Sequence, residues 1–348
     1  MTDEFRAHIL SGDLKPGDRF PSYSEARKLY GIHTNTMEKV YARLESEGLI
    51  VRKRGSGTFV AQPRQTTRKS TGIIGLSGEG FSFNGYSSYW ARLMSGVRGE
   101  AAAAEFQILL LDPESHNGWE KADGVLVCDW HALRIPRNHI ADLPVVSLMT
   151  PVEGMASVVA DEENGAQQAT EKLIALGHRR IGFLYSYEES IIVLNRLAGY
   201  RKALRAAGVT PSKKWERFLY GQCFFGAEFT TGARISLEYW LREDWRALGL
   251  TALLCHNDES ALGVIQALNE KGIRVPQDIS VIGFDGTEFC EMVSPKLTSV
   301  ELPLREIGAT GVELLLQQIA ADEVSDEHRV LPTQLQERES TAAPSHYS

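Results

Sequence analysis

The spacing of hydrophobic and polar residues changes near residue 71, which divides the chain into two regions of different architecture. Before that point, apolar residues recur every three or four positions, as they do along one face of a helix. One such stripe predicts a helix over about residues 34–47: Met37, Val40, Tyr41 and Leu44. After that point, short continuous apolar runs alternate with amphipathic segments, a pattern typical of buried parallel strands connected by helices.

The first region has the element order of a winged helix-turn-helix. Ser22 and Glu25 have the spacing of a capping box and begin a helix, and Gly31 allows a tight turn before the helix over 34–47. Two short β-forming runs follow and complete the order with a two-stranded wing. The second helix of such a motif lies in the major groove, so the polar residues of its face opposite the stripe are candidates for base contacts: Thr34, Asn35, Thr36 and Lys39. A polar helix face that is only solvated is the alternative.

The connection between the two β-forming runs is basic and rich in glycine, since residues 52–60 are RKRGSGTFV. Gly55 and Gly57 accept the positive φ that a hairpin tip requires, and without a Cβ their backbone can approach another surface closely. Arg52 and Arg54 on this hairpin would suit DNA phosphates. The same stretch would also serve as an ordinary solvated turn, and the motif alone does not decide between the two interpretations.

Charge is distributed unevenly between the two regions. Residues 1–70 hold 13 Lys+Arg and 8 Asp+Glu, a balance of +5, whereas the remainder of the chain has a balance of −13 within a total of −8. A basic region attracts a polyanion that the acidic region repels, which indicates two separate functions. Together with the element order, this favours DNA binding by the first region.

The first region resembles the DNA-binding domain of GntR-type bacterial regulators. The resemblance rests on GDLKPGD in the loop before the second helix, on PS at the start of that helix, on LESEGLI and on RGSGTFV. It implies a DNA-binding domain over residues 1–60, with base and phosphate contacts from the two helices and the wing tip. By position the implied DNA-binding residues are Ser24, Arg27, Thr34, Asn35, Thr36, Lys39, Arg52, Arg54, Gly55 and Gly57.

Residues 61–71 are polar and aperiodic, which indicates a linker, and the rest of the chain predicts an α/β body. Its apolar runs predict parallel strands at residues 72–78, 106–112, 123–129, 143–149, 179–186, 252–258 and 279–286. The segments between them predict helices at residues 86–105, 166–178, 196–209 and 259–273. About 277 residues exceed one such core, so we expect two doubly wound subdomains.

Polar residues at the ends of the predicted strands are candidates for a ligand site, because ligands of open parallel sheets bind beyond the carboxyl ends of the strands. Asp129, Asn257, Asp258 and Asp285 follow such strands, and Arg196 begins a helix after another. Carboxylate, amide and guanidinium groups suit a sugar-like polyol, whose ring face an aromatic side chain such as Tyr89 or Trp90 would cover. The alternative for each acidic or amide residue is a helix N-cap, which is the interpretation favoured for Asp258.

The second region resembles the effector domain of LacI/GalR-type repressors, which is similar to periplasmic sugar-binding proteins. The segments that carry the resemblance include RLAGYRKALRAAGV, NDESALGVIQALNEKGIRVPQDISVIGFDG and LPTQLQERESTAAP. It implies an effector-binding and dimerisation domain over residues 72–348, with subdomain 1 at about 72–160 and 304–331 and subdomain 2 at about 161–303 and 332–348. The effector-binding residues that it implies are Tyr89, Trp90, Asp161, Ser190, Arg196, Phe224, Asn257 and Asp285.

A GntR-type domain on a LacI/GalR-type body resembles the arabinose-repressor class of regulators. The implied function is a DNA-binding transcriptional repressor: a homodimer on a palindromic operator, controlled by a sugar or sugar derivative. The alternative is a GntR-type regulator fused to a body that resembles enzymes dependent on pyridoxal phosphate, but no lysine stands out for the Schiff base.

The sequence predicts neither a cofactor nor a metal site, and it has no run apolar enough to span a membrane. Four widely spaced cysteines indicate reduced, buried thiols, and with the absence of a signal peptide they predict a cytoplasmic protein. Because GEGFSF lacks the third glycine of a phosphate loop and GLSGE is not the GxSxG of hydrolases, we do not expect an enzyme.

Overall fold

Two separate units make up the chain in this computed structural model, Met1–Lys69 and Ser70–Ser348. We call them the head and the body and describe each by itself. The structure describes residues 5, 14–15, 17–21, 25, 40–41, 43–45, 49–53, 57–60, 70–78, 88–112, 118–128, 143–186, 190–221, 227–243 and 245–345.

The described part of the head contains a three-stranded antiparallel sheet of order β1-β3-β2. Its strands are β1 (Arg19–Phe20), β2 (Ile50–Lys53) and β3 (Gly57–Val60). The pairing of β2 with β3 runs from Ile50 opposite Val60 to Lys53 opposite Gly57, which confirms the predicted hairpin. Gly57 has a φ of 115°, a backbone conformation that favours glycine, as the sequence predicted for this position.

A small apolar core holds the head sheet against a helical segment that contains Val40, Tyr41 and Leu44. The Phe20 ring lies 5.0 Å from the Phe5 ring and 5.3 Å from the Tyr41 ring, between centroids. Val40, Tyr41 and Leu44 are buried, which confirms three of the four residues of the predicted stripe. Most of the two predicted head helices, Met37 included, lies outside the described residues.

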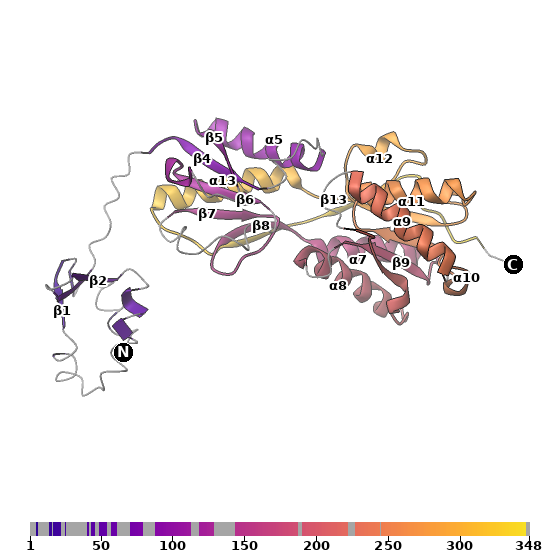
Figure 1. Ribbon diagram of the computed structural model, residues 1–348, viewed down its shortest axis with the longest axis horizontal. Coiled ribbons are helices and arrows are strands. Elements are labelled where there is room, and N and C mark those ends of the chain that lie inside the picture. Colours follow the sequence, from indigo (N-terminus) through magenta and orange to yellow (C-terminus); the bar gives the residue numbers. More distant parts are fainter. Residues whose placement is uncertain are drawn as a thin grey trace. The chain divides into compact units, whose positions relative to one another are not determined.

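The body has two lobes, each built on a six-stranded sheet (Figure 1). The first lobe has the all-parallel order β14-β8-β7-β6-β4-β5. Its strands are β4 (Ile73–Ser77), β5 (Gln107–Leu111), β6 (Gly124–Cys128), β7 (Val145–Leu148), β8 (Ala156–Ala160) and β14 (His328–Leu331). Helices α5 (Ser88–Ala103) and α13 (Leu304–Ala321) pack against each other beside this sheet. Their apolar faces fill the same core as the buried strands β6 and β7.

The second lobe has the strand order β10-β9-β11-β12-β13-β15. Its strands are β9 (Ile181–Tyr185), β10 (Glu216–Phe218), β11 (Ala252–Cys255), β12 (Ser280–Asp285), β13 (Thr298–Glu301) and β15 (Gln334–Gln336). Helices α7 (Glu162–Ala175) and α8 (Ile191–Ala206) cover one face, and α9 (Ala227–Glu243) and α11 (Asp258–Glu270) cover the other (Figure 1). Short helices η1 (Trp119–Lys121), η3 (Lys213–Trp215), α10 (Trp245–Leu248) and α12 (Phe289–Met292) complete the described elements.

The predicted doubly wound architecture of the body is confirmed, with local differences. Strand β15 pairs antiparallel with β13, so the second sheet is not wholly parallel. The helix predicted from residue 166 begins four residues earlier, at Glu162, because Asp161 caps it. Helix α9 had no counterpart among the predicted elements.

Within the described residues of the body, the chain passes between the lobes three times, and these three crossings lie together. They follow β8, β13 and β14, and they pass through Asp161, Pro303 and Thr333. The Asp161 amide donates to the Leu331 carbonyl at 2.8 Å, and the Thr333 hydroxyl donates to the Asp161 carbonyl at 3.2 Å. These bonds fasten two of the crossings to each other.

The cysteines agree with the prediction where the structure describes them. Cys128, Cys255 and Cys290 are buried free thiols, and Cys223 lies outside the described residues. In the described part of the chain, none of the helices is long and apolar enough to cross a bilayer.

Candidate functional site

The carboxyl ends of the parallel strands β9, β11 and β12 meet at one edge of the second sheet, and this edge carries the candidate site. Asp285 is the last residue of β12, and His256 and Asn257 follow β11 directly. Arg196 reaches the same edge from α8, since its guanidinium contacts both Asp285 and the His256 carbonyl. The structure therefore brings together residues whose common location was predicted from separate strand ends.

Arg196 is the centre of this cluster, and it is only 3% exposed. Its Nε donates to Glu162 Oε2 at 2.7 Å, and its Nη2 lies 3.5 Å from Asp285 Oδ1. Its Nη1 donates to the His256 carbonyl, and its Cζ lies 3.7 Å above the centre of the Phe284 ring. Burial acts to lower the pKa of Arg196, but the charges of Glu162 and Asp285 outweigh it and raise that pKa.

Close packing of α7 on α8 brings Glu162 and Arg196 within reach of each other. Gly199 lies one turn after Arg196, and a Cβ at that position would come within 2.0 Å of the Glu163 carbonyl oxygen. Only a glycine lets the two helices approach this closely. The same approach places Glu162, in the first turn of α7, against the guanidinium.

Asp285 is buried in a backbone conformation that is rare for a residue with a side chain, with a φ of 101°. Burial raises its pKa well above the ordinary range; the Arg196 charge opposes this change, and the neighbouring carboxyl groups of Asp258, Glu259 and Glu162 add to it. A carboxyl group with a raised pKa can donate a hydrogen bond as well as accept one. Asp285 therefore suits a ligand hydroxyl in either role.

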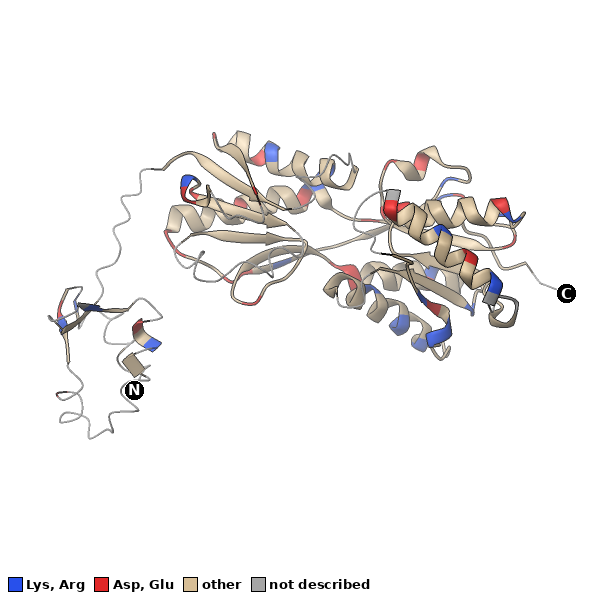
Figure 2. Ribbon diagram, in the orientation of Figure 1, with Lys and Arg blue, Asp and Glu red and all other residues tan. Residues whose placement is uncertain are grey.

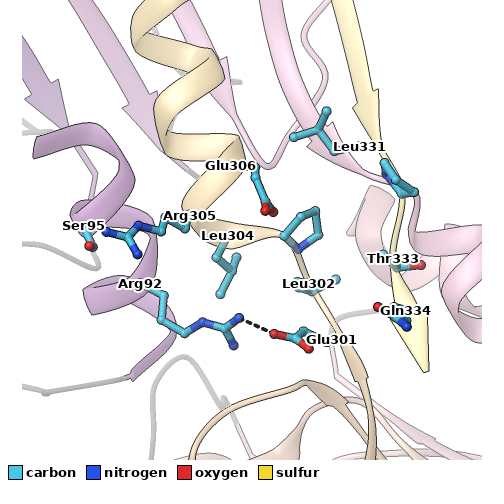
Figure 3. Close-up of a pocket in the computed structure, with 12 residues that line it drawn as sticks. Arg92, Ser95, Glu301, Leu302, Leu304, Arg305, Glu306, Leu331, Thr333 and Gln334 are labelled. Carbon is cyan, nitrogen blue, oxygen red and sulfur yellow. Dashed lines mark hydrogen bonds and ion pairs between the residues drawn. The ribbon is translucent and has the colours of Figure 1, made fainter. Parts of the chain in front are cut away.

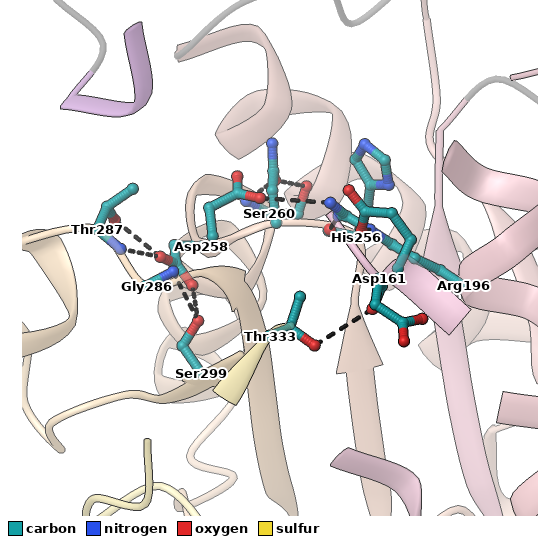
Figure 4. Close-up of polar contacts among 12 residues, drawn as sticks. Asp161, Arg196, His256, Asp258, Ser260, Gly286, Thr287, Ser299 and Thr333 are labelled. Atoms are coloured by element: carbon teal, nitrogen blue, oxygen red, sulfur yellow. Dashed lines mark hydrogen bonds and ion pairs between the residues drawn. The ribbon is translucent and has the colours of Figure 1, made fainter. Parts of the chain in front are cut away.

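Asp258 fixes the turn that follows Asp285 (Figure 4). Its Oδ2 accepts hydrogen bonds from the Thr287 amide at 2.7 Å and the Thr287 hydroxyl at 2.8 Å, and its Oδ1 accepts from the Ser299 hydroxyl at 2.5 Å. The Ser299 hydroxyl also accepts from the Gly286 amide at 3.2 Å. Burial raises the pKa of Asp258, while the hydrogen bonds from Ser299 and Thr287 lower it.

The N-cap of α11 is Asn257 and not Asp258, which corrects the interpretation of Asp258 as a cap. The Asn257 Oδ1 accepts from the Ser260 amide at 2.9 Å and from the Ser260 hydroxyl at 2.5 Å. Asp258 is one residue further along and turns to the loop after β12 instead. The capping bonds use the carbonyl oxygen of the Asn257 side chain, which leaves its two amide hydrogens for other partners.

Glu162 and His256 belong to the cluster although neither was among the predicted site residues. Glu162 Oε1 and His256 Nδ1 are both buried and have no hydrogen-bond partner among the described residues. Burial lowers the pKa of His256 well below its ordinary value, and the nearby Arg196 charge adds to this effect, so its imidazole is neutral at pH 7. The His256 ring lies 5.6 Å from the Phe229 ring, between centroids.

The first turns of α5 bring the first lobe into contact with this edge of the second sheet. Arg92 Nη1 donates to the Gly286 carbonyl at 2.8 Å, and its Nη2 donates to Glu301 Oε1 at 2.8 Å. The Ser88 hydroxyl donates to the Glu288 carboxylate. Helix α5 is therefore attached to the turn that carries Asp285, and the sequence analysis had not identified Arg92 as part of this contact.

The predicted aromatic pair lies on the same turns of α5. The rings of Tyr89 and Trp90 meet edge to face, 5.0 Å apart between centroids, and both residues are partly buried. Tyr89 is close enough to the guanidinium to contribute to the raised pKa of Arg196.

The remaining effector predictions have different outcomes in the structure. Asp161 caps α7, accepting from the Asn164 amide at 3.0 Å, and lies directly before Glu162. Ser190 occupies the N-cap position of α8 without a capping bond from its side chain. Phe224 and Asp129 lie outside the described residues. Within the described residues, no group of His, Cys, Asp and Glu is arranged to hold a metal ion.

A hollow of about 890 Å³ lies beside the chain crossings and the start of α13 (Figure 3). Arg92, Ser95 and Glu301 contribute to its lining, as do the crossing residues Leu302 to Leu304 and Leu331 to Gln334. None of the predicted effector residues lines it. We therefore place the candidate site at the Arg196 cluster, where the ionisable groups converge, and not at this hollow.

In the head, only Arg52 and Gly57 of the predicted DNA-binding residues are described. Arg52 is exposed on β2, and its Nε lies 3.1 Å from the Glu45 carboxylate. The other predicted contacts lie outside the described residues: Ser24, Arg27, Thr34, Asn35, Thr36, Lys39, Arg54 and Gly55.

Acidic and basic positions both occur along the helices of the body, with several basic positions on α8 (Figure 2).

Each unit of the chain matches a known protein family. Residues 2–60 match the gntR family of bacterial regulatory proteins, and residues 170–341 match the periplasmic binding protein-like domain. The second match includes Arg196, Asn257 and Asp285. Both matches agree with the resemblances stated from the sequence.

Two named relatives of the chain are transcriptional repressors. The chain is 25% identical over 348 residues to the arabinose metabolism transcriptional repressor of Geobacillus stearothermophilus, with 94% of this chain and 93% of the relative covered. It is 33% identical over 205 residues to the repressor PurR of Vibrio vulnificus, with 58% of each chain covered. Among solved structures, a LacI family transcriptional regulator from Enterococcus faecium with bound ribose is 26% identical, with a TM-score of 0.66 over 78% of this chain and 100% of that chain.

Proposed function

We propose that this chain, a GntR-type regulator with a LacI-type, periplasmic-binding-protein-like body, binds operator DNA as a homodimer and changes its operator affinity when a sugar-like effector enters the body. Its role as a DNA-binding transcriptional regulator rests on the gntR match and on the repressors among its relatives. A regulator of operator DNA in bacteria works in the cytoplasm, which is where we place it.

One observation supports the effector part of the proposal: Arg196, Asp285 and Asn257 converge on one strand edge of the second sheet. Their guanidinium, carboxyl and amide groups offer donors and acceptors in the arrangement that adjacent ring hydroxyls need. Tyr89 and Trp90 on α5 are the aromatic residues that we assign to the apolar face of the ring. The ribose bound to the regulator from Enterococcus faecium supports a sugar as the ligand class.

We assign the head to the operator, with the recognition helix in the major groove and the wing on the phosphate backbone. Two heads in a dimer would bind two half-sites of a palindrome. Contacts between α5 and the turn after Asp285 provide a route by which the ligand would influence the first lobe. By thermodynamic linkage, effector and operator then change each other's affinity by the same factor.

A titration of operator DNA tests this proposal. Fragments selected in vitro from genomic DNA are titrated with the full chain by fluorescence anisotropy, with and without arabinose or ribose. We expect Asp285→Ala to keep its operator affinity and to lose the response to the sugar. Glu163→Ala is the control, since Glu163 is an exposed acid of the same lobe that pairs with Lys202.

Two results would count against the proposal. Failure of every selected fragment to bind the wild-type chain would contradict the regulator function. A sugar response that survives Asp285→Ala in a folded protein would contradict the location of the site. The match of residues 170–341 to a binding-protein-like domain favours a ligand-binding body over one that resembles a pyridoxal-phosphate enzyme.

A further inference from the structure

The Arg196 guanidinium is surrounded, among the described residues, by more carboxyl groups than its charge requires. Glu162 lies 2.7 Å and Asp285 lies 3.5 Å from Arg196, and each of the two carboxyl groups is less than a tenth exposed. Asp258 and Glu259 are also buried at the start of α11, on the same strand edge. Glu162 alone is enough to match the positive charge of Arg196, whichever protons the other carboxyl groups hold.

An anionic ligand would therefore find no unmatched positive charge among the described residues of this cluster. A phosphate or carboxylate placed here would have to displace Glu162 from the guanidinium or remain beside buried carboxyl groups. Like charges in a buried site repel strongly, and a buried charge without a partner is costly. The nearby Arg92 does not change this balance, because it pairs with Glu301 and with backbone carbonyls.

Two buried atoms of the same cluster show what the ligand has to supply. Glu162 Oε1 lacks a hydrogen-bond partner among the described residues, and so does His256 Nδ1. A buried polar atom without a partner costs free energy until something binds it. A carboxylate oxygen can only accept, so it requires a hydroxyl or an ammonium group and not another acceptor.

Resting on the proposed effector site, we propose that the body binds a hydrogen-bond-donating ligand without negative charge, such as an unmodified sugar or an amino sugar, and that Glu162 excludes phosphorylated and acidic sugars. Glu162 is then a residue that determines specificity. It performs this role by neutralising Arg196 with one oxygen and offering the other oxygen to the ligand. His256 stays neutral and adds no positive charge that would attract an anion.

Substitution of Glu162 provides the test, because Glu162→Gln keeps the shape of the side chain and removes its charge. Glu163→Gln is the matched control: the same change one residue along α7, at an exposed carboxylate that pairs with Lys202 at 2.9 Å. Full-length wild type and both variants are titrated with inorganic phosphate and with ribose 5-phosphate at constant ionic strength. Binding is measured as the shift of the body's unfolding temperature and by calorimetry.

We expect Glu162→Gln to bind both anions at least about tenfold more tightly than wild type, because its guanidinium is no longer fully matched. Wild type and Glu163→Gln should respond alike, and any phosphate binding by the basic head is common to all three proteins. Equal anion binding by wild type and Glu162→Gln, whether weak or strong, overturns the proposal. If Glu162→Gln does not fold, Glu162→Ala replaces it with the same expected gain, because it also removes the carboxylate that matches Arg196.

Operator binding by the same preparations separates this inference from the proposed function. If all three proteins bind the selected DNA and the expected anion pattern is missing, only the ligand class is wrong. If the wild-type chain binds no DNA, the regulator function is wrong, whatever the anions do.

Discussion

Arg196 in the body and Arg52 in the head carry the same guanidinium in opposite surroundings. Arg196 is almost completely buried and is held by two carboxyl groups and a backbone carbonyl. The side chain of Arg52 is 42% exposed, and its partner Glu45 is equally accessible. A buried charge is costly without a partner, so it favours only ligands whose charge and hydrogen bonds match it. An exposed charge interacts weakly with any single partner and depends strongly on salt. The body is therefore built to discriminate between ligands and the head to attract DNA.

The largest expected effect is the difference in lost stability between a variant without Arg196 and a variant without Arg52. We expect Arg196→Met to destabilise the body by about 3–5 kcal/mol, because Glu162 and Asp285 are left buried without their counter-charge. Arg52→Ala should change stability by less than about 1 kcal/mol, as is usual for an exposed ion pair. Urea unfolding of the full chain, followed by the fluorescence of the body tryptophans, measures the value for Arg196→Met, and amide hydrogen exchange of the head strand β3 measures the value for Arg52→Ala. Similar losses for the two variants would remove the distinction between the regions.

The stability of the body should also depend on pH, because its buried carboxyl groups, unlike exposed groups, titrate differently in the folded and unfolded states. Burial raises the pKa of Glu259 to about 7, with help from the charges of Asp258 and Glu288. Between the ordinary pKa of a glutamate and pH 7, the folded body keeps this proton and the unfolded chain has lost it, so stability is highest below this window and falls as pH rises through it. We expect Glu259→Gln to remove at most about 3 kcal/mol of that fall. Urea titrations at pH 5 and pH 7.5 check this, and an unchanged slope with pH would show that Glu259 is not the group responsible.

The smallest expected effect belongs to the wing. Arg54→Ala should weaken operator binding a few-fold and reduce the slope of log affinity against log salt by about 0.9, the value for one lost phosphate contact. Binding isotherms at several potassium chloride concentrations give the slope. Glu162→Gln is a suitable control, because a change in the body should leave the slope as it is. An unaltered slope in Arg54→Ala would reject the wing as a phosphate contact.

Much of the body could be predicted because its buried parallel strands are short continuous apolar runs, a pattern typical of such strands. The position of Asp285 followed from the same logic, since strand ends of one sheet meet at one edge. Arg196 reaches that edge as predicted, but it does not begin its helix: α8 begins at Ile191, and Arg196 lies in the second turn. Helix α9 was missed: its first turns contain Thr230, Thr231 and Gly232, which are poor helix formers, so packing against α11 determines its structure.

The parts of the site that were missed depend on distances that sequence spacing does not contain. Glu162 is an acid in the first turn of a helix, a position that the helix dipole favours without any ligand. Only the close approach of α8 at Gly199 makes it the partner of Arg196. Asn257 caps α11 in place of Asp258, although either side chain could form the cap. Asp258 instead accepts hydrogen bonds from Thr287 and Ser299, which lie far along the chain and could not be foreseen from the local sequence.

The three neighbouring chain crossings between the lobes determine what kind of motion a ligand can cause. Two lobes connected by one strand could rotate in any direction. The neighbouring connections at Asp161, Pro303 and Thr333 restrict the lobes to rotation about one axis. Sliding or twisting of one lobe against the other would stretch at least one crossing. A small molecule that draws the lobes together can therefore produce a single, reproducible angular displacement.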